Sequence, residues 1–275
     1  MQSQSYLPHE SLRPYVQCFV YSCVGDPNDV GLQELDLFPV GYSLMAFILK
    51  ESHQLFNFGT NKSYDVRFNF TGQLDRYHHL LASSSSMIYV LFKPHGAYQL
   101  LGIPQHLLKN ECTSLFDLMG SSIHEIFSKM EDQAHSPKAV IALLEQWLLQ
   151  QFHRHRHLDT NRIRLVCEEI ILHKGKLSIQ ELNSTCGMSK SSMEHYFKEQ
   201  VGLSPKVYSR IVRFNQLNRF LRAGATTDWM EIVDRYGYFD QSHFIHEFKH
   251  FFGYSPSQMH LSYQNLAEHI TSIDK

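Results

Sequence analysis

The sequence lacks any long apolar run. None exceeds six residues, as in Leu44–Leu49, whereas a membrane-spanning helix needs about 20. The first ten residues also lack the basic stretch and the following apolar stretch that mark a secretion signal. The 5 cysteines are widely spaced and form no Cys-x-x-Cys pair, which argues against a disulfide framework and against a zinc knuckle. We therefore expect a cytoplasmic protein with reduced thiols and no membrane segment.

A strong basic excess is also missing. The 275-residue chain has 25 Lys+Arg against 27 Asp+Glu, whereas DNA-binding domains usually carry a basic face. The segment from Asp159 onward has 14 Lys+Arg against 13 Asp+Glu, a balance of +1. The segment before it has 11 Lys+Arg against 14 Asp+Glu, a balance of −3. With 43% hydrophobic and 19% charged residues, the composition is typical of a globular chain of one large or two ordinary domains. Any contact with nucleic acid must depend on local patches.

Short extended segments fill the chain up to about residue 115. They are rich in Phe, Tyr, Val and Ile, and polar or glycine-containing breaks separate them. This pattern predicts a small antiparallel β-barrel or sandwich. The predicted strands lie at residues 15–23, 42–50, 54–59, 64–70 and 86–92.

Helical periodicity begins after these strands, in residues 115–133 and 138–152. The second helix has an apolar face made of Val140, Leu143, Leu144, Trp147 and Leu148. A core and a dimer seam would both use such a face, and core packing is favoured. HRHRH at 153–157 follows without a flanking carboxylate or cysteine. We interpret it as a solvated, basic interdomain linker rather than a metal site.

A repeat occupies the carboxyl-terminal part. FKEQVGLSP at 197–205 recurs as FKHFFGYSP at 248–256, an offset of 253 − 202 = 51 residues. In each copy a short amphipathic segment ends at a glycine suited to the left-handed conformation, and a polar residue is placed to cap the next helix. This is the pattern of a helix-turn-helix, whose second helix lies in the DNA major groove. The glycines are Gly187 and Gly237, and the caps are Ser189 and Asp240.

Helical spacing also assigns the outward face of each second helix. Two apolar residues four apart in each copy must face the core. They are Met193 and Phe197 in the first copy, and Phe244 and Phe248 in the second. The polar residues between them are left outward, where side chains reach base edges. The predicted DNA-contacting residues are Lys190, Ser191, Ser192, Glu194, His195 and Lys198 in the first copy, and Gln241, Ser242, His243, His246 and Lys249 in the second.

One long helix is predicted between the two copies, at residues 206–224. Its apolar stripe can hold the two second helices at a fixed separation, which for successive major grooves is about 34 Å. Four arginines on or beside this helix are candidate phosphate contacts, although solvated helix arginines are the usual case. They are Arg210, Arg213, Arg219 and Arg222, and we include Arg213 among the predicted DNA-contacting residues.

Residues 159–262 resemble the DNA-binding domain of the AraC/XylS transcription regulators. The motifs that carry the resemblance are Gly187-Met-Ser189, the block at 197–205, Arg213-Phe214 and GYFDQSHFIHEFKHFFGYSP at 237–256. The resemblance implies two helix-turn-helix units joined by one helix. It places the base-reading positions on Ser191, Glu194, His195, Ser242, His243 and His246.

The chain departs from that family pattern at four positions. Asn183 and Val233 stand where a small alanine is usual, so the packing of the first helix in each unit should differ in detail. His195 and His246 stand where arginine is frequent. A relative's operator sequence therefore cannot be transferred to this protein.

The amino-terminal half resembles the cupin-like sensor domain of a subset of these regulators, in LRPYVQCF at 12–19 and FKPHGAYQLLGIP at 92–104. The resemblance implies an effector or dimerisation domain at 1–115, a helical segment with a basic linker at 116–158, the DNA-binding domain at 159–262 and a tail at 263–275. The implied partners are double-stranded promoter DNA, RNA polymerase, a small effector and a second copy of the chain. No cofactor and no metal are expected.

Three histidines, His243, His246 and His250, share one helix face at spacings of three and four, as metal ligands could. The helix-turn-helix interpretation makes the first two base readers. It leaves His250, a turn further on, solvated or beside a phosphate.

We therefore expect an α+β, two-domain protein in which an antiparallel β-barrel and its following helices precede an all-α domain, acting as a sequence-specific DNA-binding transcription regulator. The alternative is a cupin-like binding protein or enzyme whose helical repeat only mediates assembly. The histidines of the β-rich region lack the close histidine and carboxylate spacing of a metal-dependent cupin enzyme, and we expect no catalysis. They are His53, His78, His79 and His95.

Overall fold

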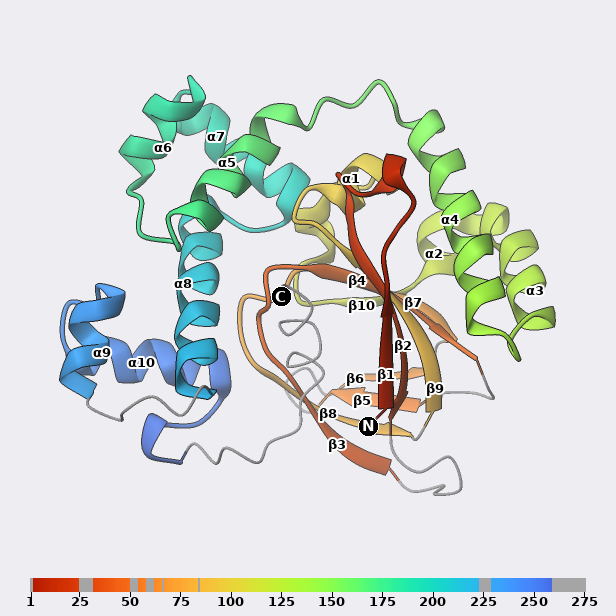
Figure 1. Cartoon of the computed structure of the whole chain (residues 1–275), viewed down its shortest axis with the longest axis horizontal. Coiled ribbons are helices and arrows are strands. Elements are labelled where there is room, and N and C mark those ends of the chain that lie inside the picture. The colour runs from red at the N-terminus through yellow and green to blue at the C-terminus, as the bar shows by residue number, and fades with distance from the viewer. Residues whose placement is uncertain are drawn as a thin grey trace.

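The structure, a computed structural model, describes residues 2–24, 32–49, 54–57, 62–65, 67–83, 85–222 and 229–258. Strands dominate the amino-terminal half and helices form the carboxyl-terminal part, packed beside the strands (Figure 1). The predicted α+β class is confirmed. The predicted tail at 263–275 lies outside the described residues.

The described strands form two antiparallel sheets. No described strand of one sheet pairs with a strand of the other. The larger sheet is buried on both faces, because apolar residues of opposite orientation, such as Val90 and Leu91, both lie in hydrophobic clusters. Its strands, in spatial order, are β1 (Gln2–Tyr6), β2 (Val16–Val24), β9 (Ser85–Phe92), β4 (Ser43–Ile48), β7 (Phe68–Thr71) and β10 (Cys112–Ser114). The smaller sheet contains β3 (Leu32–Leu37), β8 (His78–Ser83), β5 (Gln54–Asn57) and β6 (Lys62–Asp65).

Strand prediction was accurate for four of the predicted segments. Strands β2, β4, β5 and β9 lie where they were predicted. The segment predicted as one strand at 64–70 is instead shared between β6 and β7, which belong to different sheets. Four further strands, β1, β3, β8 and β10, were not predicted.

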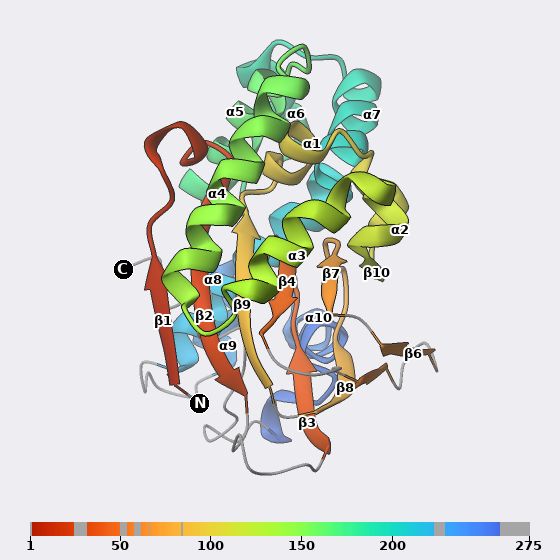
Figure 2. The same cartoon turned by 90° about the vertical axis from the view of Figure 1, so that its right-hand side faces the viewer.

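Helices α3 (His124–Asp132) and α4 (Pro137–Arg154) cover one face of the larger sheet (Figure 2). The hydroxyl of Ser136 caps α4 by accepting from the Ala139 N–H. Four of the five predicted face residues of α4 are buried in one cluster with the sheet, and the fifth, Leu143, is half-buried at its edge. This face is therefore part of the core. Two shorter helices, α1 (Gly96–Leu101) and α2 (Leu115–Met119), complete the region.

The basic segment HRHRH is only partly the solvated linker that we predicted. Helix α4 continues through Arg154, and His153, Arg154, Arg156 and His157 are exposed. His155, however, is half-buried, and its Nδ1 lies 2.9 Å from the carbonyl oxygen of Leu100 in α1. The His155 carbonyl also accepts from the Gln99 amide at 3.0 Å. The linker prediction is wrong at His155, which ties the end of α4 to α1.

The carboxyl-terminal part contains the predicted pair of helix-turn-helix units and the connecting helix. The hydrophobic faces of all six helices meet in one cluster of buried residues. The helices are α5 (Asn161–Leu172), α6 (Ile179–Cys186), α7 (Lys190–Val201), α8 (Pro205–Arg222), α9 (Trp229–Tyr236) and α10 (Gln241–Phe252).

The loop after β3 inserts Phe38 into this helical cluster. Phe38 is only 4% exposed, and its ring lies 4.7 Å from that of Phe252 and 5.7 Å from that of Tyr77, measured between centroids. Two residues on, the Val40 carbonyl accepts from the Asn215 amide of α8 at 3.1 Å. The two halves of the chain therefore share part of one core.

Replacing Phe38 with Ala should loosen the helices around it, because removing a buried aromatic ring costs about 3–5 kcal/mol. We expect faster amide hydrogen exchange in α10 of F38A. Phe70→Ala is the matched control, since Phe70 is 0% exposed but lies in the core of the larger sheet. F70A should raise exchange in that sheet without a selective effect on α10. Unchanged exchange in α10 of F38A would show that Phe38 does not hold this helix.

Candidate nucleic-acid interface

Both turns have the geometry that the repeat predicts. Gly187 and Gly237 adopt φ values of 61° and 69°, in the left-handed region that favours glycine. The side chain of Ser189 accepts from the Ser192 N–H at 3.1 Å, and that of Asp240 accepts from the His243 N–H at 2.7 Å. Each second helix therefore begins at a satisfied cap directly after a sharp turn.

Helix α7 presents the first predicted contact face. Met193 and Phe197 are both 0% exposed, which fixes the opposite side of the helix toward solvent. Glu194 is half-buried, and its carboxylate lies 3.8 Å from the Lys198 ammonium one turn on. Ser192 is half-buried and is engaged with the cap through its backbone N–H. The exposed members of the face are Lys190, Ser191, His195 and Lys198.

Helix α10 presents the second predicted contact face. Phe244 and Phe248 are 0% exposed, as their spacing predicts, and Ile245 is half-buried beside them. All five predicted contact residues of this helix are exposed: Gln241, Ser242, His243, His246 and Lys249.

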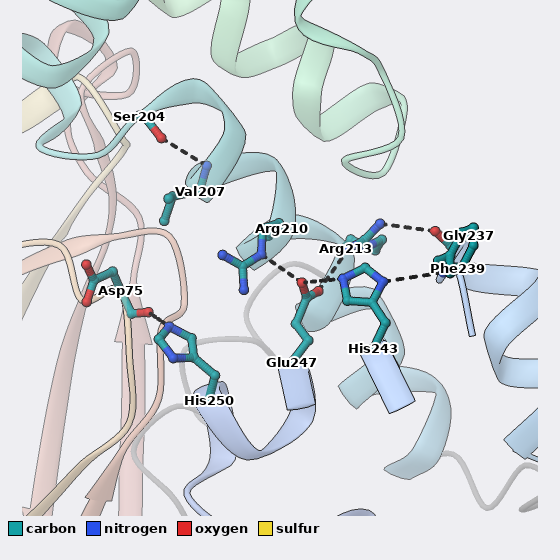
Figure 3. Close-up of polar contacts among 10 residues, drawn as sticks. All are labelled: Asp75, Ser204, Val207, Arg210, Arg213, Gly237, Phe239, His243, Glu247 and His250. Carbon is teal, nitrogen blue, oxygen red and sulfur yellow. Dashed lines mark hydrogen bonds and ion pairs between the residues drawn. The ribbon is translucent and has the colours of Figure 1, made fainter. Parts of the chain in front are cut away.

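His243 is held by contacts on both ring nitrogens (Figure 3). Its Nδ1 accepts from the Phe239 N–H at 3.4 Å, which assigns the ring proton of the neutral form to Nε2. That Nε2 lies 3.9 Å from the Glu247 carboxylate, and the side chain is 45% exposed. His243 thus sits at the rim of the contact face in a fixed orientation.

Glu247 joins α10 to the connecting helix α8. Its side chain is 1% exposed, and its two carboxylate oxygens accept from Arg210 Nε at 2.7 Å and from Arg213 Nη2 at 2.9 Å (Figure 3). The guanidinium of Arg213 also lies over the ring of Tyr238, 4.5 Å from its centroid, and donates to the Gly237 carbonyl. Arg213 was predicted to contact DNA. Its side chain is only 14% exposed, and its guanidinium is engaged within the protein.

Glu247 was not among the predicted functional residues, although its position in the sequence indicates a role. It lies three residues after Phe244 and four before Phe251, on the buried face of the helix. An acidic residue on such a face needs a cationic partner. Burial raises the pKa of the Glu247 carboxyl, but Arg213 and Arg210 outweigh this effect and bring the pKa below its usual value.

His250 was predicted to be solvated or beside a phosphate. It is exposed, but it also makes contacts within the protein that were not predicted. Its Nε2 lies 2.7 Å from the carbonyl oxygen of Asp75 (Figure 3), and its own carbonyl accepts from the Tyr77 N–H at 3.3 Å. His250 therefore contacts the amino-terminal half, while His243 faces Glu247. In the described part of the chain, no three His, Cys, Asp or Glu residues lie together as a metal site would require.

A basic cleft of about 650 Å³ lies between the two units, bounded by the turn before α6, by α8 and by the start of α10. Lys206 is exposed at its edge, Arg210 is half-buried, and Lys176 donates to the Arg235 carbonyl at 2.8 Å. His243 lines the same cleft, so the cleft is continuous with the second contact face. Its charged lining residues are Lys176, Lys206, Arg210, Arg213 and Glu247.

Replacing Glu247 with Gln should destabilise the second unit, since it leaves two guanidiniums without their buried counter-charge. We expect a loss of about 3–5 kcal/mol in the free energy of unfolding. Because the carboxyl pKa is lowered by folding, this contribution is present above the ordinary Glu pKa of about 4.3 and is lost as pH falls through the folded-state value. The difference between parent and E247Q should therefore shrink in acid.

The control for this variant is Glu168→Gln, which removes an exposed pair with Arg164 at 2.8 Å. Its effect should stay within about 0.5 kcal/mol. Chemical unfolding at several pH values measures both variants. Equal small effects of E247Q and E168Q would contradict the role given to the buried carboxylate.

Comparison with known proteins gives two family matches. Residues 182–261 match a family model described as a helix-turn-helix domain, and residues 4–114 match one described as a domain of unknown function, DUF6597. YbfI of Bacillus subtilis (strain 168), an uncharacterized HTH-type transcriptional regulator, is 25% identical over 155 residues. That match covers 54% of this chain and 54% of YbfI, so the chain spans about half the length of this relative.

Among solved structures, this chain is similar to ToxT from Vibrio cholerae strain SCE256, in the apo form of a lysine-to-alanine variant. The two align with 14% identity and a TM-score of 0.46, over 87% of this chain and 96% of ToxT. The AraC-like transcriptional activator CuxR aligns with 12% identity and a TM-score of 0.25, over 83% of this chain and 90% of CuxR. The family match coincides with the two units described above. The carboxyl-terminal part of the chain is therefore similar to the helix-turn-helix domain family, and its predicted resemblance to the AraC/XylS type is confirmed.

Proposed function

We propose that this protein is a sequence-specific DNA-binding transcription regulator. The observation that carries the proposal is the pair of polar faces on α7 and α10, each on the second helix of a capped helix-turn-helix unit. One helix, α8, joins the two units and packs into the core that they share. Such an arrangement can place two helices in successive major grooves.

Specificity and affinity would come from different residues. The exposed histidines, serines and Gln241 can donate to or accept from base edges, whereas lysines contribute by neutralising phosphates. We extend the phosphate contacts to the basic cleft, where Lys206 is exposed and Arg210 half-buried. Arg213 is left out of the interface, because its guanidinium is engaged by Glu247 and by the ring of Tyr238.

The chemistry of the contact faces favours DNA over an assembly role. Stable protein interfaces have an apolar, often aromatic centre and are depleted in lysine. The eleven contact residues predicted on α7 and α10 are all polar, and three are lysines: Lys190, Lys198 and Lys249. The repeat therefore suits a polyanion better than a second protein surface.

The remaining expectations are part of the proposal. A small effector in the amino-terminal half, contact with RNA polymerase and assembly of two copies rest on the resemblance. The cytoplasmic location rests on the cysteine pattern and the missing apolar segments, and the absence of catalysis on the spacing of the amino-terminal histidines. The contacts between the amino-terminal loops and the helical core give an effector a physical route to the DNA-binding part.

Selection from a pool of randomised duplexes tests the function. The full chain should be used, since Phe38 of the amino-terminal half lies in the helical core. We expect enrichment of one sequence with two contacted segments about one helical turn apart, confirmed by footprinting. Failure to enrich any sequence, together with salt-independent binding, would refute the proposal.

His246→Ala should change specificity. If this exposed imidazole reads a base, its loss should cost about 1–3 kcal/mol on the selected site and relax the preference at about one base pair. Binding to a set of single-base variants of the site measures this effect. Equal weakening on every variant would instead identify His246 as a phosphate contact.

Lys206→Ala should weaken binding uniformly across these variants. The slope of log affinity against log salt concentration should fall by about one unit. Lys138→Ala is the matched control, because Lys138 is equally exposed but lies on α4 in the amino-terminal half. An unchanged slope for K206A would remove the cleft from the proposed interface.

A further inference from the structure

Phe239 is the most exposed large apolar side chain in the part of the chain that the structure describes, at 90%. It lies in the turn of the second unit, directly before the cap Asp240 and the reading helix α10. Neither the family motif nor the spacing of the repeat assigned it a role. An aromatic ring left almost wholly in water needs a reason, since its burial would be favourable.

The ring is exposed on a fixed backbone. On one side, Tyr238 is 5% exposed, with its ring 5.2 Å from Phe244 and beneath the Arg213 guanidinium. On the other side, Asp240 caps α10 through the His243 N–H. Between them, the Phe239 N–H donates to His243 Nδ1 at 3.4 Å (Figure 3). The turn is therefore held at three successive residues, while the Phe239 side chain projects outward.

The neighbours of Phe239 define what it can meet. Gln241 and Ser242 follow it at the amino-terminal end of α10, and both are exposed. This is the end of a recognition helix that contacts base edges in the major groove. An uncharged ring offers nothing to a phosphate oxygen. The apolar group that the major groove presents is the C5-methyl of thymine, which phenylalanine can contact.

We propose that Phe239 is a specificity residue that packs on the C5-methyl group of a thymine beside the bases read by α10. The inference rests on the proposed DNA-binding function and adds a residue and a base identity to it. Insertion of the ring between base pairs is the less favoured geometry, because such apolar wedges enter from the minor groove. In this contact the polar residues of α10 and the Phe239 ring read adjacent positions.

The proposal is tested by removing the methyl group from the DNA and the aromatic ring from the protein. Each thymine of the selected site is replaced in turn by deoxyuridine, which lacks only the methyl group, and binding is measured for the parent and for F239A. We expect one position at which loss of the methyl weakens the parent about fourfold, the value of one buried methyl group. At that position F239A should bind the two duplexes equally.

Two further variants serve as controls. Phe239→Leu keeps an apolar side chain and should retain part of the discrimination between thymine and deoxyuridine. Leu172→Ala removes another exposed apolar side chain, 70% exposed at the end of α5, and should bind like the parent. Thermal unfolding of each variant establishes that the fold is intact, as expected for changes at exposed positions.

The outcomes separate this inference from the proposed function. If selection yields no site for the parent, the proposed function fails and the inference fails with it. If a site is selected but no thymine couples to Phe239, the inference alone is overturned. A selected site with no thymine in the segment contacted by α10 would overturn it equally.

Discussion

The placement of the helical part depends on one buried contact, the insertion of Phe38 from the amino-terminal half into the aromatic core of the helices. The ring meets Phe252, the last residue of α10. The loop after β3 thereby fixes the end of α10. Since interiors are close-packed, the position of this ring cannot change without moving the helix that it touches.

Both reading helices are held at their carboxyl ends by the same half of the chain. Gly202 ends α7, and a Cβ added there would lie 2.9 Å from the Gln105 carbonyl oxygen. Gly253 ends α10, and a Cβ added there would lie 2.5 Å from the Tyr77 ring. Glycine is needed at both positions for this approach as well as for its positive φ. The amino-terminal ends of the two helices, where the predicted contacts gather, point away from these attachments (Figure 1).

The helix-turn-helix units could be predicted because their determinants are local. A glycine, a cap and two apolar residues four apart each act within one turn, and they recur in register. The attachment of the units could not be predicted in the same way. The contact of His250 with Asp75 joins residues 175 positions apart, and the Asp75 partner is a backbone carbonyl that any residue would supply. Phe38 likewise lies in a loop, where no periodicity assigns a face.

Charge gave the least reliable predictions at the site. Arg213 and His250 are residue types that can contact DNA, but spacing alone could not separate a side chain that faces solvent from one that faces a neighbouring element. The buried position of Glu247 was the missing information, since a carboxylate there requires cations from α8. In the smaller sheet β5 was predicted but β3 and β8 were not, because their sequences, LQELDL and HHLLAS, lack a regular alternation of apolar and polar residues.

Glu247 also has a consequence for how the protein would find its site. The carboxylate that fixes α10 to α8 engages the Arg213 guanidinium and offsets part of the charge of Arg210, in a chain whose formal net charge is already −2. Affinity for random sequence depends almost wholly on such charges. We therefore expect any binding to non-target DNA to depend mainly on the exposed lysines, such as Lys190, Lys198, Lys206 and Lys249.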